Sequence, residues 1–577
     1  AVGDGDIYLG SRTRDEMLHL VTVTSDVDPG AAYLLNRRTG EVTFLFRPRP
    51  NLPREHLARV QPVRYTARDG MEIPAYLTVP QGAEARGLPA IILPHGGPWA
   101  RDTWGYDSFA QFLANRGFAV LQPNFRGSTG YGKAFLNAGN REWGTGAMQH
   151  DITDGARWLV QQGIADPARI GIMGGSYGGF ATLAGLAFTP DVYAAGVSIV
   201  GPSSIITLLE SIPPYWEPII RIFSVRVGDL DVPADREMLQ AQSPLYSAEN
   251  IRAPLLVIQG ANDPRVKKPE SDQIVIALRD LGRDVEYLVA PDEGHGFANR
   301  INRIAMFAAI ERFLAPRLGG RYQEDMPDEI AERLASHLVD VDTLRLVPAT
   351  TVSAEDFAPP VFDGSAVRPG TLRYTTNMQV MGQSLELAGE RTVEAAEVDG
   401  RRVWWIIETA RTPMGAIADS TLVDAATLAP IRRVQRQGPA VAEMAFAGDS
   451  VTGRIQAGPQ ELPIRARADG GMLADGAPLH IALATLPLAT GYTTAVRLFE
   501  LMGGAPKLHR VEVTGTETVT VPAGEFDTYR VEIQPVDGGG ATVIWYERAA
   551  PHRLIRAEAT LPAQAGGGQA TTELVEG

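Results

Sequence analysis

The sequence predicts a doubly wound α/β domain with a mostly parallel sheet, preceded by a short β meander and followed by a separate all-β domain. Between about residues 61 and 318, short apolar runs alternate with stretches of helical period. Parallel strands that are buried on both faces and joined by helices give this pattern. Residues 7–46 read instead as short strands separated by turns, and residues 371–577 as hairpins without a helical period of useful length.

The elements of the α/β domain follow from these runs. The expected strands are residues 90–93, 118–121, 169–173, 195–200, 255–258 and 285–289, and the expected helices are 107–116, 148–162, 178–188, 268–281 and 301–314. Strands and helices that alternate in this way build a sheet covered by helices on both faces.

The chain of 577 residues is too long for a single hydrophobic core, and changes of pattern divide it into four segments. Residues 1–60 are the β meander, and residues 61–320 are the α/β domain. Residues 321–370 are a linker with a short helix at about 327–338 and a stretch that carries Pro348, Pro359, Pro360 and Pro369. Residues 371–577 form the all-β domain.

Charge and composition narrow the range of partners. The chain has 53 basic and 68 acidic residues, a formal net charge of −15, so it should repel nucleic acid and anionic membrane surfaces. It contains no cysteine, which excludes disulfides and thiolate chemistry. No run approaches the roughly 18 apolar residues of a membrane helix, so we expect no membrane span. A homo-oligomer is left open.

The first residues, Ala1 to Asp6, contain neither an initiator Met nor a charged and then apolar signal pattern. We therefore expect a processed or trimmed start, either the mature form of an exported protein or a fragment of a longer one. The compartment is undecided on these grounds.

A nucleophile motif stands at residues 174–178, Gly-Gly-Ser-Tyr-Gly, which matches the G-x-S-x-G pattern. A serine exposed on a sharp strand-to-helix turn needs small neighbours, because strand and helix pass close together. An expected strand precedes Ser176 and an expected helix follows it, which argues against a glycine-rich loop with an incidental serine. The motif predicts an α/β-hydrolase with Ser176 as nucleophile.

A serine hydroxyl needs a histidine to accept its proton and an acid to orient that histidine, and α/β-hydrolases carry them in the order Ser, acid, His. Of the five histidines after Ser176, only His295 directly follows an expected parallel strand. Asp263 follows the preceding strand and is the expected acid, although an Asp before proline is also common in turns. Three further carboxylates are weaker candidates: Asp272, Asp292 and Glu293.

The oxyanion hole should be formed by backbone N–H groups. One donor is the residue after the nucleophile, Tyr177. The other should lie in the loop His95-Gly-Gly-Pro98 after the first parallel strand, where we assign Gly97. His95 is expected to orient this loop rather than to transfer protons.

Four motifs in order carry a family resemblance: His95–Pro98, Gly174–Gly179, Asn262–Val266 and Glu293–Phe297. Together they resemble the prolyl oligopeptidase family, with the acylaminoacyl-peptidase branch nearest. The resemblance covers about residues 5–318. It implies that Ser176, Asp263 and His295 form the triad and that the meander corresponds to the last blade of the family's propeller.

The same resemblance implies that Arg265 binds a substrate carbonyl, the alternative being a surface salt bridge. It gives no support to dipeptidyl-peptidase activity, since the propeller-borne pair of glutamates that grips a free amino terminus is not found. Within residues 205–226, Tyr215 and Trp216 are candidates for an apolar substrate pocket, although ordinary packing would explain them equally well.

The all-β domain shows no catalytic constellation, and its segment from Gly515 to Val531 resembles β domains of bacterial envelope proteins. With the processed-looking start, this favours a periplasmic or secreted location. No metal site and no cofactor are expected.

We therefore predict a serine peptidase that cleaves short or blocked peptides. A carboxylesterase for small or aromatic esters is the alternative, because the same triad would serve both reactions. A binding protein with an inactive hydrolase domain is disfavoured by the complete set of triad residues.

Overall fold

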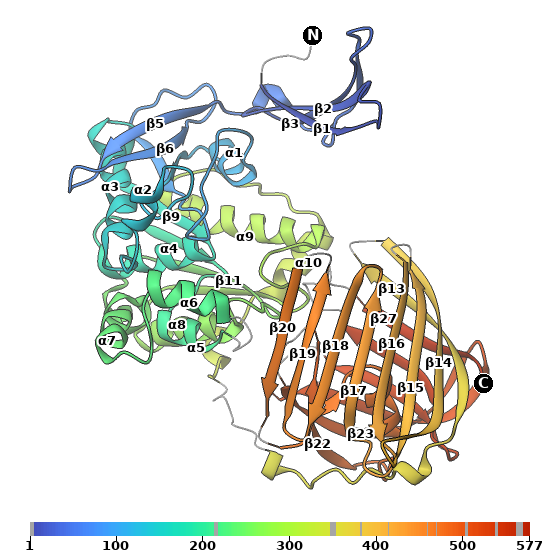
Figure 1. Cartoon of the computed structure of the whole chain (residues 1–577). Coiled ribbons are helices and arrows are strands. Elements are labelled where there is room, and N and C mark those ends of the chain that lie inside the picture. The colour runs from blue at the N-terminus through green and yellow to red at the C-terminus, as the bar shows by residue number, and fades with distance from the viewer. Residues whose placement is uncertain are drawn as a thin grey trace. The chain divides into compact units, whose positions relative to one another are not determined.

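The structure is a computed structural model of the whole chain (Figure 1). It describes residues 5–212, 217–346, 354–380, 383–412, 415–457, 460–468, 470–501, 506–536, 541–560 and 569–577. The chain divides into two compact units. The first runs from Ala1 to Leu346 apart from a short segment after Ile212, and the second contains Val347–Gly577.

The first unit begins with a four-stranded antiparallel sheet, in which each strand pairs with the next along the chain. Its strands are β1 (Asp6–Arg12), β2 (Leu18–Ser25), β3 (Asp28–Asn36) and β4 (Val42–Phe46). In β2, buried and half-buried residues alternate, as expected for a strand with only one face on a core.

The second sheet of this unit has eight strands in the order β12-β11-β10-β9-β7-β8-β6-β5. The bounds are β5 (Val60–Thr66), β6 (Glu72–Thr78), β7 (Leu88–Ile92), β8 (Ala119–Pro123), β9 (Ala165–Gly175), β10 (Ala195–Ile199), β11 (Leu255–Gly260) and β12 (Val285–Ala290). The six strands from β7 to β12 pair in parallel, whereas β5 and β6 form an antiparallel edge. The predicted doubly wound, mostly parallel sheet is confirmed.

Helices cover both faces of this sheet (Figure 1). Residues of α3, α4 and α8 pack in one apolar cluster, and residues of α1 and α9 pack in another. Neighbouring strand residues belong to different clusters, for example Ile92 to the first and Ile91 to the second, because successive side chains point to opposite faces.

The helices of the first unit are α1 (Ser108–Asn115), α2 (Lys133–Asn137), α3 (Ala147–Gln161), α4 (Tyr177–Phe188), α5 (Ile205–Glu210), α6 (Glu217–Arg226), α7 (Pro233–Gln242), α8 (Lys268–Asp280), α9 (Arg300–Leu318) and α10 (Asp328–His337). The last, α10, is the short helix expected near residue 330. It packs against α9, and the chain after it adds a bridge to β12 between Leu338 and Leu288.

The second unit is a single sheet of fifteen strands in the order β20 to β13 and then β27 to β21. The strands are β13 (Gly370–Val380), β14 (Gln383–Val398), β15 (Arg401–Thr412), β16 (Gly415–Asp424), β17 (Pro430–Gln437), β18 (Ala440–Ala447), β19 (Ser450–Ala457), β20 (Gln460–Arg467), β21 (Leu473–Ala474), β22 (Thr493–Phe499), β23 (Pro506–Val521), β24 (Gly524–Pro535), β25 (Thr542–Glu547), β26 (Leu554–Thr560) and β27 (Gln569–Glu576). The separate sheet-rich domain is thereby confirmed.

One helix interrupts this sheet, α11 (Ala477–Ala484), where the sequence showed no useful helical period. Its residue Leu483 packs in one cluster with Ile406 of β15, Val511 of β23 and Ile544 of β25, so the sheet curves around the helix. The expectation of a domain without helices is wrong at this point.

In the part of the chain that the structure describes, no helix is both long and apolar enough to cross a membrane.

Candidate active site

Ser176 lies at the sharp turn between β9 and α4, with φ 57° and ψ −120°. A residue other than glycine with a positive φ has a strained backbone, and this conformation persists only where its surroundings hold it. The surroundings here are glycines at close approaches. A Cβ on Gly178 would lie 2.2 Å from the carbonyl oxygen of Pro94, and one on Gly174 would lie 2.6 Å from the carbonyl carbon of Gly178. The two motif glycines are therefore required by steric contact.

His295 reaches Ser176 from the loop between β12 and α9. Its Nε2 lies 3.0 Å from Oγ of Ser176, and its Nδ1 lies 2.7 Å from Oδ2 of Asp263. A carboxylate only accepts hydrogen bonds, so Nδ1 carries the proton and Nε2 is free to accept from the serine hydroxyl. The side chain of Asp263 is completely buried and that of His295 is 16% exposed.

Asp263 is held by its own loop. Its Oδ1 accepts from the amides of Arg265 at 2.8 Å and Val266 at 3.0 Å. Because these bonds occupy one oxygen, the other is directed at His295. The structure thus brings together the three residues predicted as a triad.

The weaker candidates for the acid are engaged elsewhere. Asp272 accepts from the hydroxyl of Tyr287 at 2.8 Å and from Lys268 at 2.7 Å. The carboxylates of Asp292 and Glu293 both accept from the side-chain amide of Asn302.

The two amides predicted for the oxyanion hole lie on elements that meet at Ser176. Tyr177 is the first residue of α4, where the N–H has no partner within the helix. A Cβ on Gly96, the neighbour of Gly97, would lie 3.5 Å from Cβ of Ser176. Across the described ranges, the amides of Gly97 and Tyr177 donate to no other group of the chain. Both N–H groups are therefore unpaired in those ranges.

His95 fixes the conformation of this loop. Its Nδ1 lies 2.8 Å from the carbonyl oxygen of Gly96 and its Nε2 lies 2.9 Å from Oγ of Ser128, while its ring stacks on Phe125 at 4.5 Å. Desolvation lowers the pKa of His95 to about 4. The ring is therefore neutral at physiological pH and anchors the loop, as expected.

The predicted substrate-binding residues differ in what can be said of them. Arg265 is exposed, and its guanidinium has no hydrogen-bond or ion-pair partner among the described residues. Tyr215 and Trp216 lie outside the described residues. Further along the same stretch, Phe223 of α6 packs edge-on against Trp99 at 5.3 Å, and Trp99 directly follows Pro98. An apolar wall therefore flanks the loop of Gly97.

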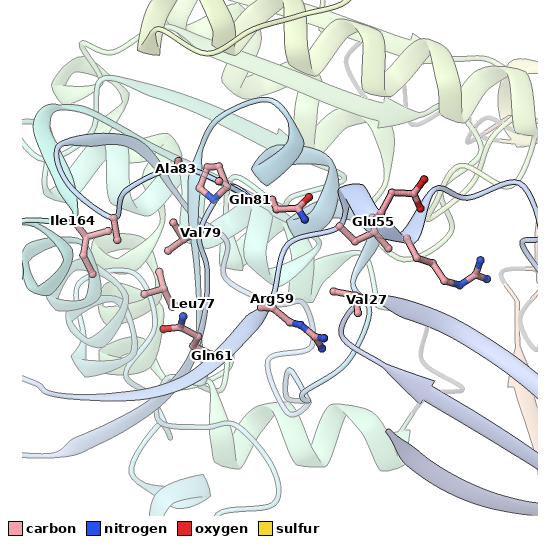
Figure 2. A pocket seen from close by; sticks show the side chains of 14 residues that line it. Val27, Glu55, Arg59, Gln61, Leu77, Val79, Gln81, Ala83 and Ile164 are labelled. Atoms are coloured by element: carbon pink, nitrogen blue, oxygen red, sulfur yellow. The ribbon is translucent and has the colours of Figure 1, made fainter. Parts of the chain in front are cut away.

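A separate hollow of about 570 Å³ lies away from these residues (Figure 2). Figure 2 shows Arg59, Gln61, Leu77 and Val79 around it, and neither Ser176 nor His295 lines it.

Within the described ranges, no three His, Asp or Glu side chains converge as metal ligands would. Ser176, His295 and Asp263 are joined by two consecutive hydrogen bonds.

Comparison with known proteins gives the family of the first unit. Residues 104–321 match the prolyl oligopeptidase family. Dipeptidyl aminopeptidase BIII of Pseudoxanthomonas mexicana is 48% identical over 328 residues, which cover 56% of this chain and 48% of that protein. Dipeptidyl peptidase family member 6 of Caenorhabditis elegans is 37% identical over 417 residues, 67% of this chain and 56% of that protein. The chain spans about half the length of these curated relatives.

Among solved structures, an acylaminoacyl peptidase of Pyrococcus horikoshii is similar with a TM-score of 0.48 and 26% identity, covering 58% of this chain and 52% of that one. Residues 377–574 of the second unit match a family of proteins of unknown function, DUF3108. The two curated relatives carry peptidase names, so these comparisons do not favour the carboxylesterase alternative. Through residues 104–321, the first unit contains a domain of the prolyl oligopeptidase family.

Proposed function

We propose that the chain cleaves short or blocked peptides by acyl transfer, with Ser176 as nucleophile, His295 as general base and then general acid, and Asp263 as the residue that orients His295. The observation that carries this proposal is the continuous pair of hydrogen bonds from Oγ of Ser176 through His295 to Asp263, 3.0 Å and 2.7 Å long. It stands at a strained strand-to-helix turn, which exposes the nucleophile.

The reaction would proceed in two steps. Nε2 of His295 takes the hydroxyl proton while Oγ of Ser176 attacks the scissile carbonyl, and the imidazolium is stabilised by Asp263. The amides of Tyr177 and Gly97 would donate to the oxyanion of the tetrahedral intermediate. His295 then protonates the leaving amine, and a water molecule activated by the same nitrogen hydrolyses the acyl-enzyme.

Arg265 is our candidate for holding the substrate. Its backbone amide is bonded to Oδ1 of Asp263 at 2.8 Å, which fixes the residue beside the triad, while its side chain is exposed and unpaired among the described residues. A free guanidinium so placed could donate a hydrogen bond to a substrate carbonyl oxygen. The names of two relatives also suggest substrates with a free amino terminus two residues before the scissile bond.

Labelling with a fluorophosphonate tests the proposal. The wild-type chain should be labelled at Ser176 and should hydrolyse peptide anilides. Ser176→Ala should lose both properties, with activity down roughly 10³-fold or more. Ser336→Ala is the matched control, since that hydroxyl on α10 donates only to the carbonyl of Arg333. Normal turnover by Ser176→Ala would refute the assignment.

Three substrates then separate the reactions: a blocked peptide anilide, a dipeptide anilide with a free amino terminus, and a p-nitrophenyl ester. Faster cleavage of the blocked peptide would support the proposed substrate class. A preference for the free dipeptide would support the specificity that the relatives' names suggest.

A further inference from the structure

The catalytic histidine is carried by a loop that glycine makes intrinsically adaptable. Residues 291–299 join β12 to α9, and His295 stands between Gly294 and Gly296. Because glycine has no Cβ, it lets the backbone adopt more conformations than other residues do. Something other than the local sequence must therefore hold His295 within 3.0 Å of Ser176.

The carboxylate of Glu293 closes this loop on itself. Oε2 accepts from the amide of Ala298 at 2.8 Å, and Oε1 accepts from the amide of Asn299 at 2.9 Å. These contacts join a side chain two residues before His295 to the backbone three and four residues after it. The histidine is thus bracketed by a ring of hydrogen bonds.

The donors around Glu293 suit a charged carboxylate. Besides the two amides, Nδ2 of Asn302 donates to Oε1 at 2.9 Å, and Glu293 is only 3% exposed. All three partners are donors, and they lie at the N-terminal end of α9, where the helix dipole favours negative charge. A buried carboxylate with these partners is well compensated.

The backbone of Glu293 also connects the loop to the acid. Its carbonyl oxygen accepts from the amide of Asn262 at 2.9 Å, and Nδ2 of Asn262 donates to the carbonyl oxygen of Pro291 at 2.7 Å. Asn262 directly precedes Asp263. One residue therefore joins the loop of the base, the loop of the acid and the first turn of α9.

We propose that Glu293 is a positioning residue that sets the place of His295 relative to Ser176 and Asp263. This inference rests on the proposed function, since it concerns the same triad. Its physical basis is that displacement of a catalytic group by about 1 Å can cost roughly 10²-fold in rate. Without the carboxylate, the loop would keep its connection to Asn262 and the bond from Asn302 to Asp292, but it would lose the bonds that close it at Ala298 and Asn299.

The test compares Glu293→Gln with Asp292→Asn. An amide at position 293 keeps the length of the side chain, but its NH₂ group must face at least one donor. Asp292→Asn removes the same charge one residue away, from a side chain that is 46% exposed, and that accepts from Asn302 but from neither the amide of Ala298 nor that of Asn299. Active sites are counted by fluorophosphonate labelling, so that rates refer to folded and labelled enzyme.

We expect Glu293→Gln to lower kcat per labelled serine by roughly 10- to 100-fold and to slow labelling, with KM changed by less than about threefold. Asp292→Asn should stay near wild type. A purely structural role would change the labelled fraction or Tm and leave kcat per labelled serine unaltered, which would overturn the inference. An equal loss in Asp292→Asn would overturn it as well.

Glu293→Ala serves as a second variant and should lose at least as much activity as Glu293→Gln. Should it fail to fold, Glu293→Gln, which keeps the packing, carries the test. The two proposals remain distinguishable, because a wild-type chain that is not labelled at Ser176 would defeat the proposed function itself. Wild-type labelling with an unimpaired Glu293→Gln would defeat only the inference about Glu293.

Discussion

The backbone amide of Ser176 donates to the carbonyl oxygen of Ile199 at 2.8 Å, so the strained residue at the turn is fixed by the neighbouring strand β10. Val200, the next residue after Ile199, also has a positive φ of 45°. For a β-branched residue this is an uncommon conformation. Strain on both sides of this hydrogen bond is compensated by the surrounding sheet, as is frequent at active sites.

Gly178→Ala should impair both stability and catalysis. The added Cβ would lie 2.2 Å from the carbonyl oxygen of Pro94, which is backbone and cannot rotate away. The helix α4 and the loop of Gly97 would have to separate, and overpacking of this kind costs about 1–3 kcal/mol or more. Urea unfolding and kcat per labelled serine measure the two effects.

Gly175→Ala is the matched control for this substitution. Its Cβ would meet only the carbonyl oxygen of Ile199, at 3.9 Å, an ordinary van der Waals contact. We expect near wild-type stability and activity. Equal damage from both substitutions would show that the contact with Pro94 is not the cause.

His95→Gln should change how stability depends on pH. The pKa of His95 falls from 6.5 to about 4 on folding, because burial disfavours the charged ring. Between these values the unfolded chain binds a proton at this residue that the folded chain does not. The contribution of His95 to the free energy of unfolding is therefore complete above about pH 6.5 and is lost as the pH falls toward 4. The loss is at most about 1.4 kcal/mol per pH unit.

Glutamine is neutral throughout this range, so the variant should lack this contribution. The measurement is the difference in unfolding free energy between wild type and His95→Gln, by urea titration at several pH values. The difference should be constant above neutrality and shift in favour of the variant below pH 6. A difference that does not vary with pH would contradict a desolvated, neutral His95.

The fold of the first unit was predictable because short apolar strands alternate with helical stretches along the chain. The helix α11 was not, because its own sequence lacks a helical pattern. All of its residues except His480 are apolar, and it is only eight residues long. A helix surrounded by core on all sides has no polar face and therefore no amphipathic period.

The candidate triad was predictable because chain order and strand ends restrict it to few residues. The role of Glu293 was not, since the sequence presents it only as a weaker alternative to Asp263. What distinguishes it is the identity of its partners, Ala298, Asn299 and Asn302, and these depend on where α9 begins. The residues Tyr215 and Trp216 stay predictions.

A chain that ends at Leu346 should keep the proposed activity. The three candidate triad residues lie in the first unit, and its two large apolar clusters use no residue beyond Leu344. We expect a soluble protein that is labelled at Ser176, with ester and short-peptide hydrolysis within about threefold of the full chain.

Circular dichroism would establish whether the shortened protein is folded. A folded but unlabelled product would mean that the second unit contributes to the site. The full chain, labelled in parallel, is the reference for the fraction of competent serines.

Arg265 provides the means to separate peptide from ester hydrolysis. The backbone of this residue is bonded to Asp263, whereas its guanidinium is exposed and has no partner among the described residues. A peptide extends beyond its scissile carbonyl and offers a further carbonyl to this group. A small p-nitrophenyl ester offers none, so binding energy from Arg265 can contribute only to peptide cleavage.

Arg265→Ala should therefore lower kcat/KM for peptides by roughly 10-fold or more, about the 1.4 kcal/mol of one charge-assisted hydrogen bond, and change ester hydrolysis much less. Lys267→Ala removes a positive charge from the same exposed loop and should leave both activities near wild type. Equal losses on peptide and ester in Arg265→Ala would mean that the residue supports the loop of Asp263. No loss on either substrate would remove Arg265 from the substrate site, and the peptide specificity would then need another source.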